Sequence, residues 1–538
     1  MPPSPDMRGT YRTDLRARAA YAEAAGIYRI VPSAVARPVD AADLQRLVRW
    51  AAAVRAPLVP RGAGSAMGGG NVGDGIVVDL TGLSHPPVRL RPEHRIAHAG
   101  AAVTCAELNR AASAYALRLP PDPSSGKWAT LGGMLSTNAA GARSVRFGSV
   151  RRWVQAAELI TADGQAARLE RGRPAPADIA AFDRFASDAA PAIRAAADRV
   201  RAGFPRTRKN SSGYALDAWL QSGDLLDLLI GAEGTLGIVT AADWRLDRHA
   251  AASAALRVSL GSLDALGGVV ETLLAHEPAA VELLDRTFLD LVGTHGAPAR
   301  AVQGVEAVLL VEIEAESQPS AAAAVLAAAE AVRGAALRVE TAVEDADMRR
   351  LWAIRHAASP ILAGLPEERR SLQVIEDGCV PVARLGEYVR AVREAAARRK
   401  LDVVLFGHAG DGHLHCNLLP ELARAGWEAE VASLLEEVTD VVVALGGTPS
   451  GEHGDGRLRA PLLERVFGAE IVALFARVKE AFDPQGILNP GIKLGHAPPI
   501  ARLKAGAAAA ALPADIATAL RSIEREAAYA TPRLSLLD

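Results

Sequence analysis

The sequence predicts an α+β protein built from more than one domain. A chain of 538 residues is longer than a single hydrophobic core usually organises. Short strand-like runs, amphipathic helices and glycine-rich loops alternate from Tyr28 to Thr240, and the pattern changes near Arg245–Ser253. Strand-like runs and alanine-rich helices follow, which indicates a second domain with an antiparallel sheet. We expect domains at residues 1–245 and 246–425, a helical segment at 426–495 that packs back on the first domain, and an Ala/Pro-rich tail at 496–538.

Local signals mark the elements of the first domain. Asp40 is placed to cap a helix over Ala41–Val54. Thr104 and Glu107 have the spacing of a capping box, which predicts a helix that ends near Tyr115. Strands are expected on either side of a glycine-rich loop, at Pro57–Pro60 and Ile76–Leu80.

The second domain shows strand patterns separated by a helix. A helix is predicted at Ser320–Val332 from its alanine content. A hairpin is predicted farther along, from two apolar runs joined by a Gly-Asp-Gly turn at residues 410–412. The predicted strands are Leu256–Leu260, Ala307–Ile313 and Arg338–Thr341, followed by the hairpin strands Leu401–Phe406 and His413–Leu418.

Composition excludes several classes of protein. Half of the residues are hydrophobic and the net charge is −2, which opposes both disorder and nucleic-acid binding. Cys105, Cys379 and Cys416 form no C-x-x-C pair and cannot supply the four thiolates of an iron–sulfur cluster. No secretory signal and no membrane span is expected, because no long apolar run is free of charge or proline. We expect a cytoplasmic protein, with peripheral attachment to a membrane left open.

Pro60–Gly70 is the first candidate for a binding site. Its glycines let successive backbone N–H groups point into one concavity, which suits a phosphate, and Arg61 and Ser65 add a charge and a hydroxyl. The loop is not a dinucleotide-binding fingerprint, because Met67 stands where the third glycine would be and residues 71–75 continue as loop. Taken alone, the loop could also be an ordinary surface turn.

Further loops rich in Gly, Ser, Thr and Asn favour a binding site over an ordinary surface turn. Three such regions within one α/β segment exceed what turns require, and a long bent ligand with a pyrophosphate would explain them. The additional loops are Pro120–Ser125 with Thr130–Gly141 and Ser144–Gly148, and Lys209–Tyr214 with Gly231–Thr240.

Taken together, these motifs resemble the FAD-linked oxidases of the vanillyl-alcohol oxidase type. The branch they resemble most contains D-lactate dehydrogenase, D-2-hydroxyglutarate dehydrogenase and the glycolate oxidase D subunit, and the similarity extends from Tyr11 to Leu494. The resemblance implies two FAD-binding subdomains, a substrate (cap) domain with an antiparallel sheet, and a C-terminal helical segment. The motifs on which the resemblance rests are Pro60–Gly70, Pro-Asp-Pro-Ser-Ser at 121–125, Lys-Asn-x-x-Gly-Tyr at 209–214 and Glu-Gly-Thr-Leu-Gly-Ile at 233–238.

The resemblance also implies which residues contact FAD. Pro60–Gly70 contains no histidine, so non-covalent binding is expected. The implied cofactor-binding residues are Arg61, Gly62, Ala63, Gly64, Ser65, Gly68, Gly69, Pro123, Ser124, Ser125, Gly132, Gly133, Ser136, Thr137, Ser144, Gly148, Gly234, Gly237, Ile238 and Asn489.

A group of histidines and acidic residues is the second candidate site. His408 and His415 face one another across the predicted hairpin, at a separation that one metal ion can bridge. Glu452 and His453 add a carboxylate and an imidazole in a glycine-rich turn. His413 shares a strand face with His415 and could be either a ligand or a donor behind the ligands.

The resemblance assigns roles within this group. It implies that His408, His415 and Glu452 bind a divalent metal, zinc or manganese, that His453 is the catalytic base, and that Asn417 lies in the active site.

The sequence departs from the family pattern at two positions. Asparagine is usual in the family where this chain has His413, and a small apolar residue is usual where it has Asp455.

Arg355 corresponds to a substrate-binding arginine of the family, which suits a substrate carboxylate. Arg369 and Arg370 could hold a second carboxylate or form a solvated pair of charges.

The function expected from these residues is FAD-dependent oxidation of a D-2-hydroxy acid, of the D-lactate or D-2-hydroxyglutarate class, to the 2-oxo acid. The metal would polarise the hydroxyl, His453 would take its proton, and hydride would pass to flavin N5. Electrons would leave to a quinone, a cytochrome or an electron-transfer flavoprotein, and a homodimer is left open. A metal-dependent hydrolase and a flavin-binding subunit of a larger glycolate-oxidase-like complex are the alternatives.

Overall fold

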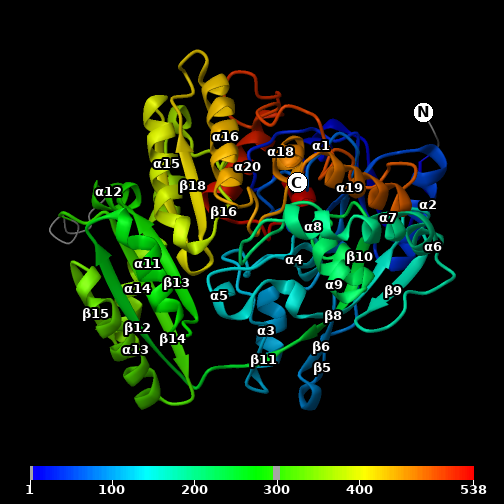
Figure 1. Ribbon diagram of the computed structural model, residues 1–538. Helices are drawn as coiled ribbons and strands as arrows, with labels where there is room; N and C mark the ends of the chain where they lie inside the picture. The colour runs from blue at the N-terminus through cyan, green and yellow to red at the C-terminus, as the bar shows by residue number, and fades with distance from the viewer. Residues whose placement is uncertain (1–3, 295–302, 538) are drawn as a thin grey trace.

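The computed structural model describes residues 4–294 and 303–537. Figure 1 shows two parts side by side. One part contains the N-terminal half of the chain with the orange helices near the C-terminus, and the other contains the green and yellow segment between them.

A four-stranded sheet begins the first part. Its order is β1-β2-β4-β3, in which β2, β4 and β3 are parallel. Helix α2 (Ala41–Val54) begins at Asp40, whose side chain accepts a hydrogen bond from the Asp43 N–H, and it buries Leu44 and Leu47 against this sheet. The strands are β1 (Thr10–Arg12), β2 (Ala34–Arg37), β3 (Leu58–Arg61) and β4 (Ile76–Asp79).

An antiparallel five-stranded sheet completes the first part. Its order is β5-β6-β10-β8-β9, and α2 packs between it and the first sheet. The strands are β5 (Arg89–Arg91), β6 (Ile96–Gly100), β8 (Val154–Ile160), β9 (Ala166–Glu170) and β10 (Ile238–Arg245), and β7 (Leu117–Arg118) pairs separately with β11 (Asp247–Arg248). The helices of this part are α1 (Leu15–Ala20), α3 (Cys105–Ser113), α4 (Leu131–Thr137), α5 (Ser144–Phe147), α6 (Ala180–Arg184), α7 (Ala190–Ala195), α8 (Ala197–Gly203), α9 (Leu216–Ser222) and α10 (Leu225–Leu229).

The second part is built on one antiparallel sheet of order β15-β12-β14-β13-β17-β18-β16. Alternate residues face opposite sides, so Leu283 and Leu309 pack with α11, α13 and α15, whereas Leu284 and Leu310 pack with α12 and α14. The strands are β12 (Ala252–Leu260), β13 (Ala280–Asp285), β14 (Ala307–Ala315), β15 (Arg338–Ala342), β16 (Gly378–Cys379), β17 (Asp402–His408) and β18 (His413–Leu419). The helices are α11 (Leu266–Leu274), α12 (Arg286–Thr294), α13 (Gln318–Val332), α14 (Asp345–Ala363) and α15 (Leu385–Arg398).

The expected helical segment 426–495 is divided between the two parts. Helix α16 (Trp427–Ala444) packs beside α15 in the core of the seven-stranded sheet. Helices α18 (Leu463–Phe467) and α19 (Ala469–Phe482) instead join the core of the five-stranded sheet. Only the second half of the segment therefore packs back on the first domain, because the apolar residues of α16 are buried in the core of the seven-stranded sheet.

Several local predictions are confirmed. The helix at Ala41–Val54 and the capping box of Thr104 with Glu107 are present. The hairpin of β17 and β18 is antiparallel and places Phe406 opposite His415. The tail forms helix α20 (Ala514–Arg525), which covers the first part.

Candidate active site

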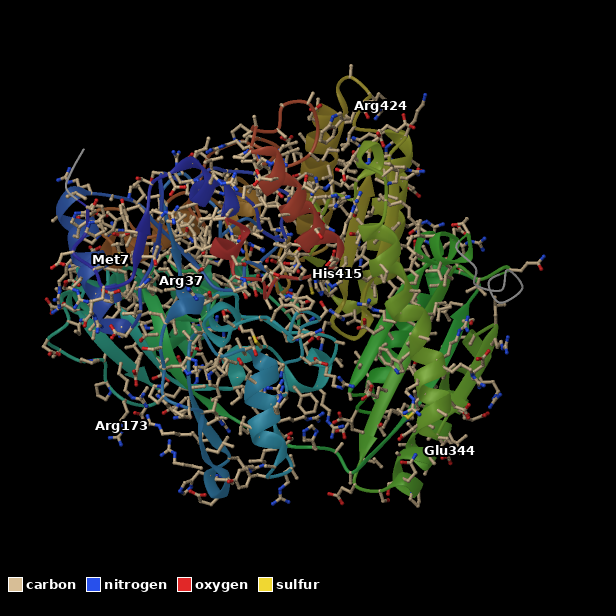
Figure 2. The ribbon with its side chains drawn as sticks, turned by 180° about the vertical axis from the view of Figure 1, so that it is seen from behind. Met7, Arg37, Arg173, Glu344, His415 and Arg424 are labelled. Carbon is tan, nitrogen blue, oxygen red and sulfur yellow. The ribbon has the colours of Figure 1, made fainter. Side chains whose placement is uncertain are left out.

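A cavity of about 800 Å³ lies where the two parts and the C-terminal tail meet. Its walls come from the glycine-rich loop after β3, the loops around α4, the strands β13, β17 and β18, and the region of α20. His415, labelled in Figure 2, lies at this junction beside the red C-terminal helix. A cavity of this size is in the range that holds a cofactor or a small ligand.

Most of the residues expected to bind the cofactor line this cavity. Those that do are Arg61, Gly62, Ala63, Gly64, Ser65, Pro123, Ser124, Ser125, Gly132, Gly133, Ser136, Thr137, Gly234, Gly237 and Ile238. The residues not found in its lining are Gly68, Gly69, Ser144, Gly148 and Asn489.

Two of the residues outside the lining support the loops instead. The Ser144 hydroxyl donates to Asp411 Oδ2 at 2.6 Å, which ties the first part to the turn of the β17–β18 hairpin. The Asn489 amide donates to the carbonyl oxygens of Gly70 at 2.7 Å and Glu233 at 2.8 Å. These side chains therefore fix the distance between two walls of the cavity.

Arg61 supports the glycine-rich loop from below. Its side chain is 2% exposed and donates to the carbonyl oxygens of Tyr21 and Glu23. Gly64 has a φ of +80°, and a Cβ there would lie 2.6 Å from Arg61 Nη2. The loop conformation therefore requires glycine at position 64, and Arg61 adds positive charge beneath it.

Three imidazoles and one carboxylate converge at the hairpin of β17 and β18. His408 Nε2 lies 3.4 Å from His415 Nε2 and 3.2 Å from Glu452 Oε1. Glu452 Oε1 is also 3.7 Å from His415 Nε2 and 3.9 Å from His413 Nδ1. Four donor atoms thus share one small volume, as the sequence predicted for His408, His415 and Glu452.

The second nitrogen of each imidazole ring is held by an oxygen acceptor. Such a contact fixes the tautomer of a neutral imidazole, so that the nitrogen facing the cluster can offer its lone pair to a cation. Burial lowers the pKa of His408, but Glu282 raises it to about 9, so this ring would release a proton when a cation binds. The pairs are His408 Nδ1 with the Glu282 carboxylate, His413 Nε2 with Asp377 Oδ1 at 2.9 Å, and His415 Nδ1 with the Glu376 carbonyl oxygen at 2.8 Å.

This donor set fits a divalent cation. Four ligands at about 2.0–2.1 Å from a tetrahedral zinc ion are about 3.4 Å apart, close to the separations in the cluster. His413 Nδ1 is buried and has no hydrogen-bond partner among the described residues. A buried nitrogen without a partner is costly, and a cation would relieve that cost.

Glu452 is held as an anion beside the histidines. Its Oε2 accepts from Lys209 Nζ at 3.0 Å and from the Gly141 N–H at 2.9 Å. Burial alone would raise the pKa of Glu452, but the charges of Lys209 and His408 hold it well below its usual range. The carboxylate is therefore charged at neutral pH and ready to bind a cation.

His453 stands next to this cluster and faces the cavity. Its ring stacks on that of His415, with centroids 5.3 Å apart, and its Nδ1 contacts the Glu376 carboxylate. Burial lowers the pKa of His453, but Glu376 and Asp377 outweigh it and raise the pKa to about 10. These carboxylates stabilise an imidazolium at this position.

Arg355 and Asn417 line the same cavity. Arg355, on α14, donates from Nε to Glu282 Oε2 at 2.7 Å and stacks 4.7 Å from the Phe406 ring centroid. Among the described side chains and backbone groups, its Nη atoms have no hydrogen-bond partner. Asn417 Oδ1 accepts from Ser371 and Gln373, both at 3.1 Å.

Two acidic residues that the sequence did not single out organise the cluster. Glu282 lies on β13 and joins His408 to Arg355. Asp377 is fully buried and accepts from His413 and from the backbone N–H groups of Glu452 and His453. A charged residue inside the apolar strand Ala280–Asp285 was the available signal for Glu282, since a buried charge needs a partner.

Asp455 lies beside the cluster but has a structural role. It is fully buried and accepts from the Gly213 N–H at 2.8 Å and from Lys493 Nζ at 3.0 Å. These contacts attach the glycine-rich turn of Glu452 and His453 to the first part of the molecule.

The helices of the described residues do not have the properties of membrane spans. None of those helices combines the length and the hydropathy that a bilayer crossing requires.

Two family models match the chain. The FAD binding domain matches residues 32–170, and the C-terminal domain of FAD linked oxidases matches residues 250–492. The first match contains the glycine-rich loop after β3, and the second contains the histidine cluster.

Curated relatives span nearly the whole chain. D-lactate dehydrogenase of Archaeoglobus fulgidus is 30% identical over 460 residues, covering 85% of this chain and 90% of the relative. Glycolate oxidase subunit GlcD of Bacillus subtilis is 29% identical, covering 86% and 89%. D-2-hydroxyglutarate dehydrogenase of Xanthomonas citri pv. viticola is 28% identical, also covering 86% and 89%.

Solved structures share the fold. A 4-ethylphenol oxidase from Gulosibacter chungangensis superimposes with a TM-score of 0.64 at 16% identity, covering 91% of this chain and 94% of that one. An alkyldihydroxyacetonephosphate synthase gives a TM-score of 0.62 at 14% identity, covering 89% and 83%. The fold, the matched domains and the relatives agree, and the chain belongs to the FAD-linked oxidases of the vanillyl-alcohol oxidase type, in the branch of D-lactate dehydrogenase, D-2-hydroxyglutarate dehydrogenase and GlcD.

Proposed function

We propose that the protein is a dehydrogenase that uses non-covalently bound FAD to oxidise a D-2-hydroxy acid to the 2-oxo acid. One observation carries the proposal. The cluster of His408, His415, Glu452 and His453 lines the same cavity as the glycine-rich loop expected to bind the FAD diphosphate. The names of the relatives, which describe oxidation of 2-hydroxy acids, support this reaction.

Different residues of the cavity would bind the substrate carboxylate and the cation. The free Nη atoms of Arg355 suit the substrate carboxylate, because a guanidinium binds a carboxylate with two parallel hydrogen bonds. His408, His415 and Glu452 would hold zinc or manganese, and the orphaned Nδ1 of His413 is placed to join them. When bound, the cation polarises the 2-hydroxyl and FAD accepts the C2 hydrogen as hydride.

His453 is placed to take the hydroxyl proton at Nε2. Its Nδ1 is held by Glu376, which orients the ring and stabilises the imidazolium once the proton arrives. The positive charge of a cation in the neighbouring cluster opposes protonation of His453 and favours its neutral, basic form.

A substrate with one carboxylate matches the cavity best. The other arginines that line it are engaged among the described residues: Arg61 with the carbonyl oxygens of Tyr21 and Glu23, Arg143 with Asp122 and Glu312, Arg370 with Glu524, and Arg521 with Glu367. Apart from Glu282, which holds Arg355 Nε, the lining includes the apolar side chains Trp352, Leu362 and Phe406. We therefore expect D-lactate to be preferred over D-2-hydroxyglutarate.

Anaerobic titration of the flavin spectrum tests the reaction. Purified protein should be yellow, and D-lactate should bleach it faster than D-2-hydroxyglutarate, glycolate or D-malate. Colourless protein that takes up no added FAD would contradict the proposal. Yellow protein that no hydroxy acid bleaches would favour a flavin-binding subunit of a larger glycolate-oxidase-like complex.

Substitution of His453 tests the base. His453→Ala should keep its flavin but lower the rate of bleaching roughly 10²–10⁴-fold, the usual contribution of a positioned base. Stopped-flow spectroscopy measures this rate, with His94→Ala as the control because His94 is exposed and is not part of the cavity lining. A His453→Ala protein with the full rate would remove this residue from the mechanism.

A further inference from the structure

The C-terminal segment 514–537 lies outside both matched family models but packs against the cofactor region. Helix α20 buries Ile516 and Leu520 among Tyr21, Val35 and Val59 on the first sheet. Tyr21 also provides the carbonyl oxygen that holds Arg61 beneath the glycine-rich loop. The segment is thus continuous with the support of that loop.

The same segment forms part of the cavity wall. Arg521, Glu524, Ala527 and Tyr529 line the cavity together with residues 61–66 and 123–125. The Tyr529 ring lies 6.0 Å, centroid to centroid, from that of Trp128, which follows the Pro-Asp-Pro-Ser-Ser motif and also lines the cavity. Its position gives the segment access to a ligand held by those loops.

Ion pairs fix the segment against the second part of the molecule as well. Glu524 pairs with Arg370, the neighbour of Ser371, whose hydroxyl donates to Asn417 Oδ1. Glu524 also pairs with Lys504 at 3.0 Å. Arg521 Nε donates to Glu367 at 2.5 Å. The segment therefore spans the boundary between the two parts at the cavity.

A second, independent observation concerns Arg533. Its side chain is buried, with 5% of the residue exposed, and its Nε and Nη1 have no hydrogen-bond partner among the described residues. Leu534, the next residue in the chain, packs with Tyr21, whose ring and carbonyl oxygen contact Arg61. In keeping with this placement, burial and the charge of Arg533 lower the pKa of Arg61 to about 10. The carboxylates that face Arg533 are those of Asp79 and Glu23. Glu23 already pairs with Arg29, and Asp79 already accepts hydrogen bonds from Tyr21 and Thr81. The second buried guanidinium therefore adds positive charge that favours an anion in the neighbouring loop.

We propose that residues 514–537 belong to the FAD site, where Arg521–Tyr529 closes the cavity over the flavin and Arg533 adds positive charge beneath the loop that binds the diphosphate. The two roles act on different parts of the cofactor. The wall contacts any flavin that enters the cavity, whereas the charge of Arg533 favours only a flavin that carries phosphate.

The role of the Arg533 charge is tested by comparing the Kd of FAD with that of riboflavin, which has no phosphate. Flavin is removed from the purified protein, and the dissociation constants are measured by quenching of flavin fluorescence. Arg533→Gln should raise the Kd of FAD roughly tenfold, as expected for one lost charge interaction, and leave the Kd of riboflavin unchanged. Arg525→Gln is the control, because Arg525 is an exposed arginine of the same segment that is absent from the cavity lining.

Two results would overturn the role of Arg533: an unchanged Kd for FAD, or equal weakening of FAD and riboflavin, which would indicate a packing defect. Because no hydroxy acid is present in this measurement, failure of the proposed reaction would not affect it.

The wall is tested with Tyr529→Ala and with a chain that ends at Pro513. Both should release FAD and riboflavin faster, and the shortened chain should lose its flavin during gel filtration. Circular dichroism and the melting temperature of the flavin-free proteins show whether each variant is folded. A folded Tyr529→Ala protein with unchanged flavin release would contradict the wall, even if the shortened chain fails to fold.

Discussion

Single side chains decide how the histidine cluster can bind a metal. His413 is fully buried, with Asp377 holding its Nε2 and leaving Nδ1 near Glu452. An asparagine in the same place would offer only a carbonyl oxygen. His413 would therefore be a fourth donor to the proposed cation, beside the three expected from the sequence.

Replacing this side chain tests the fourth donor. His413→Asn should weaken binding of zinc or manganese about 10–100-fold, the effect typical of altered partners around a metal site. Competition with a chelator measures the Kd, and the absorption spectrum of the Co²⁺-loaded protein reports the loss of a nitrogen ligand. His98→Asn is the control, because His98 pairs with Asp243 in the five-stranded sheet. An unchanged Kd and Co²⁺ spectrum would show that His413 is not a ligand.

At the scale of elements, the hairpin of β17 and β18 brings the three histidines of the cluster together. Its turn requires Gly412, which has a φ of +70° and leaves no room for a side chain, since a Cβ would lie 1.9 Å from the Val380 carbonyl oxygen. The hairpin was predictable because its strand pattern and its turn are local in sequence. Its partner β13, which provides Glu282, was not, because nothing local to either strand specifies that pairing.

Gly412→Ala should destabilise the protein more than a glycine replacement at a similar φ in open space. Gly172 provides that comparison, with a φ of +69° and nothing within 4 Å of an added Cβ. Both replacements carry backbone strain of about 1–3 kcal/mol, and the steric conflict at Gly412 adds about 1–3 kcal/mol. Urea unfolding of the two variants measures the difference in the free energy of unfolding. Equal midpoints would show that the hairpin turn accommodates the added methyl group without loss of stability.

For the whole molecule, the C-terminal segment connects the two parts through Glu524. Burial alone would raise the pKa of Glu524, but Lys504 and Arg370 lower it to about 2. A carboxyl group with a lowered pKa in the folded state stabilises the protein above its unfolded pKa of about 4.3. This stabilisation is lost as the pH falls from there toward 2.

The pH dependence of the melting temperature tests this connection. Wild-type protein should be more stable than Glu524→Gln at pH 6, and the difference should shrink as the pH falls from 4.5 to 3, because the protonated carboxyl no longer pairs with Lys504 and Arg370. Other carboxyl groups titrate in both proteins and cancel in the comparison. A difference that stays constant over this range would show that Glu524 is not stabilised by its charge.

The sequence by itself determined the glycine-rich loops, the hairpin, the capped helices and the family, because each depends on residues close together in the chain. It also named His408, His415, Glu452 and His453 from the residue types that a metal and a proton transfer need. Only the tertiary structure decided the partners of these side chains, the division of the segment 426–495 between two cores, and the place of the C-terminal segment in the cavity wall. Those features depend on which distant apolar faces and buried charges complement one another, and no local pattern specifies that.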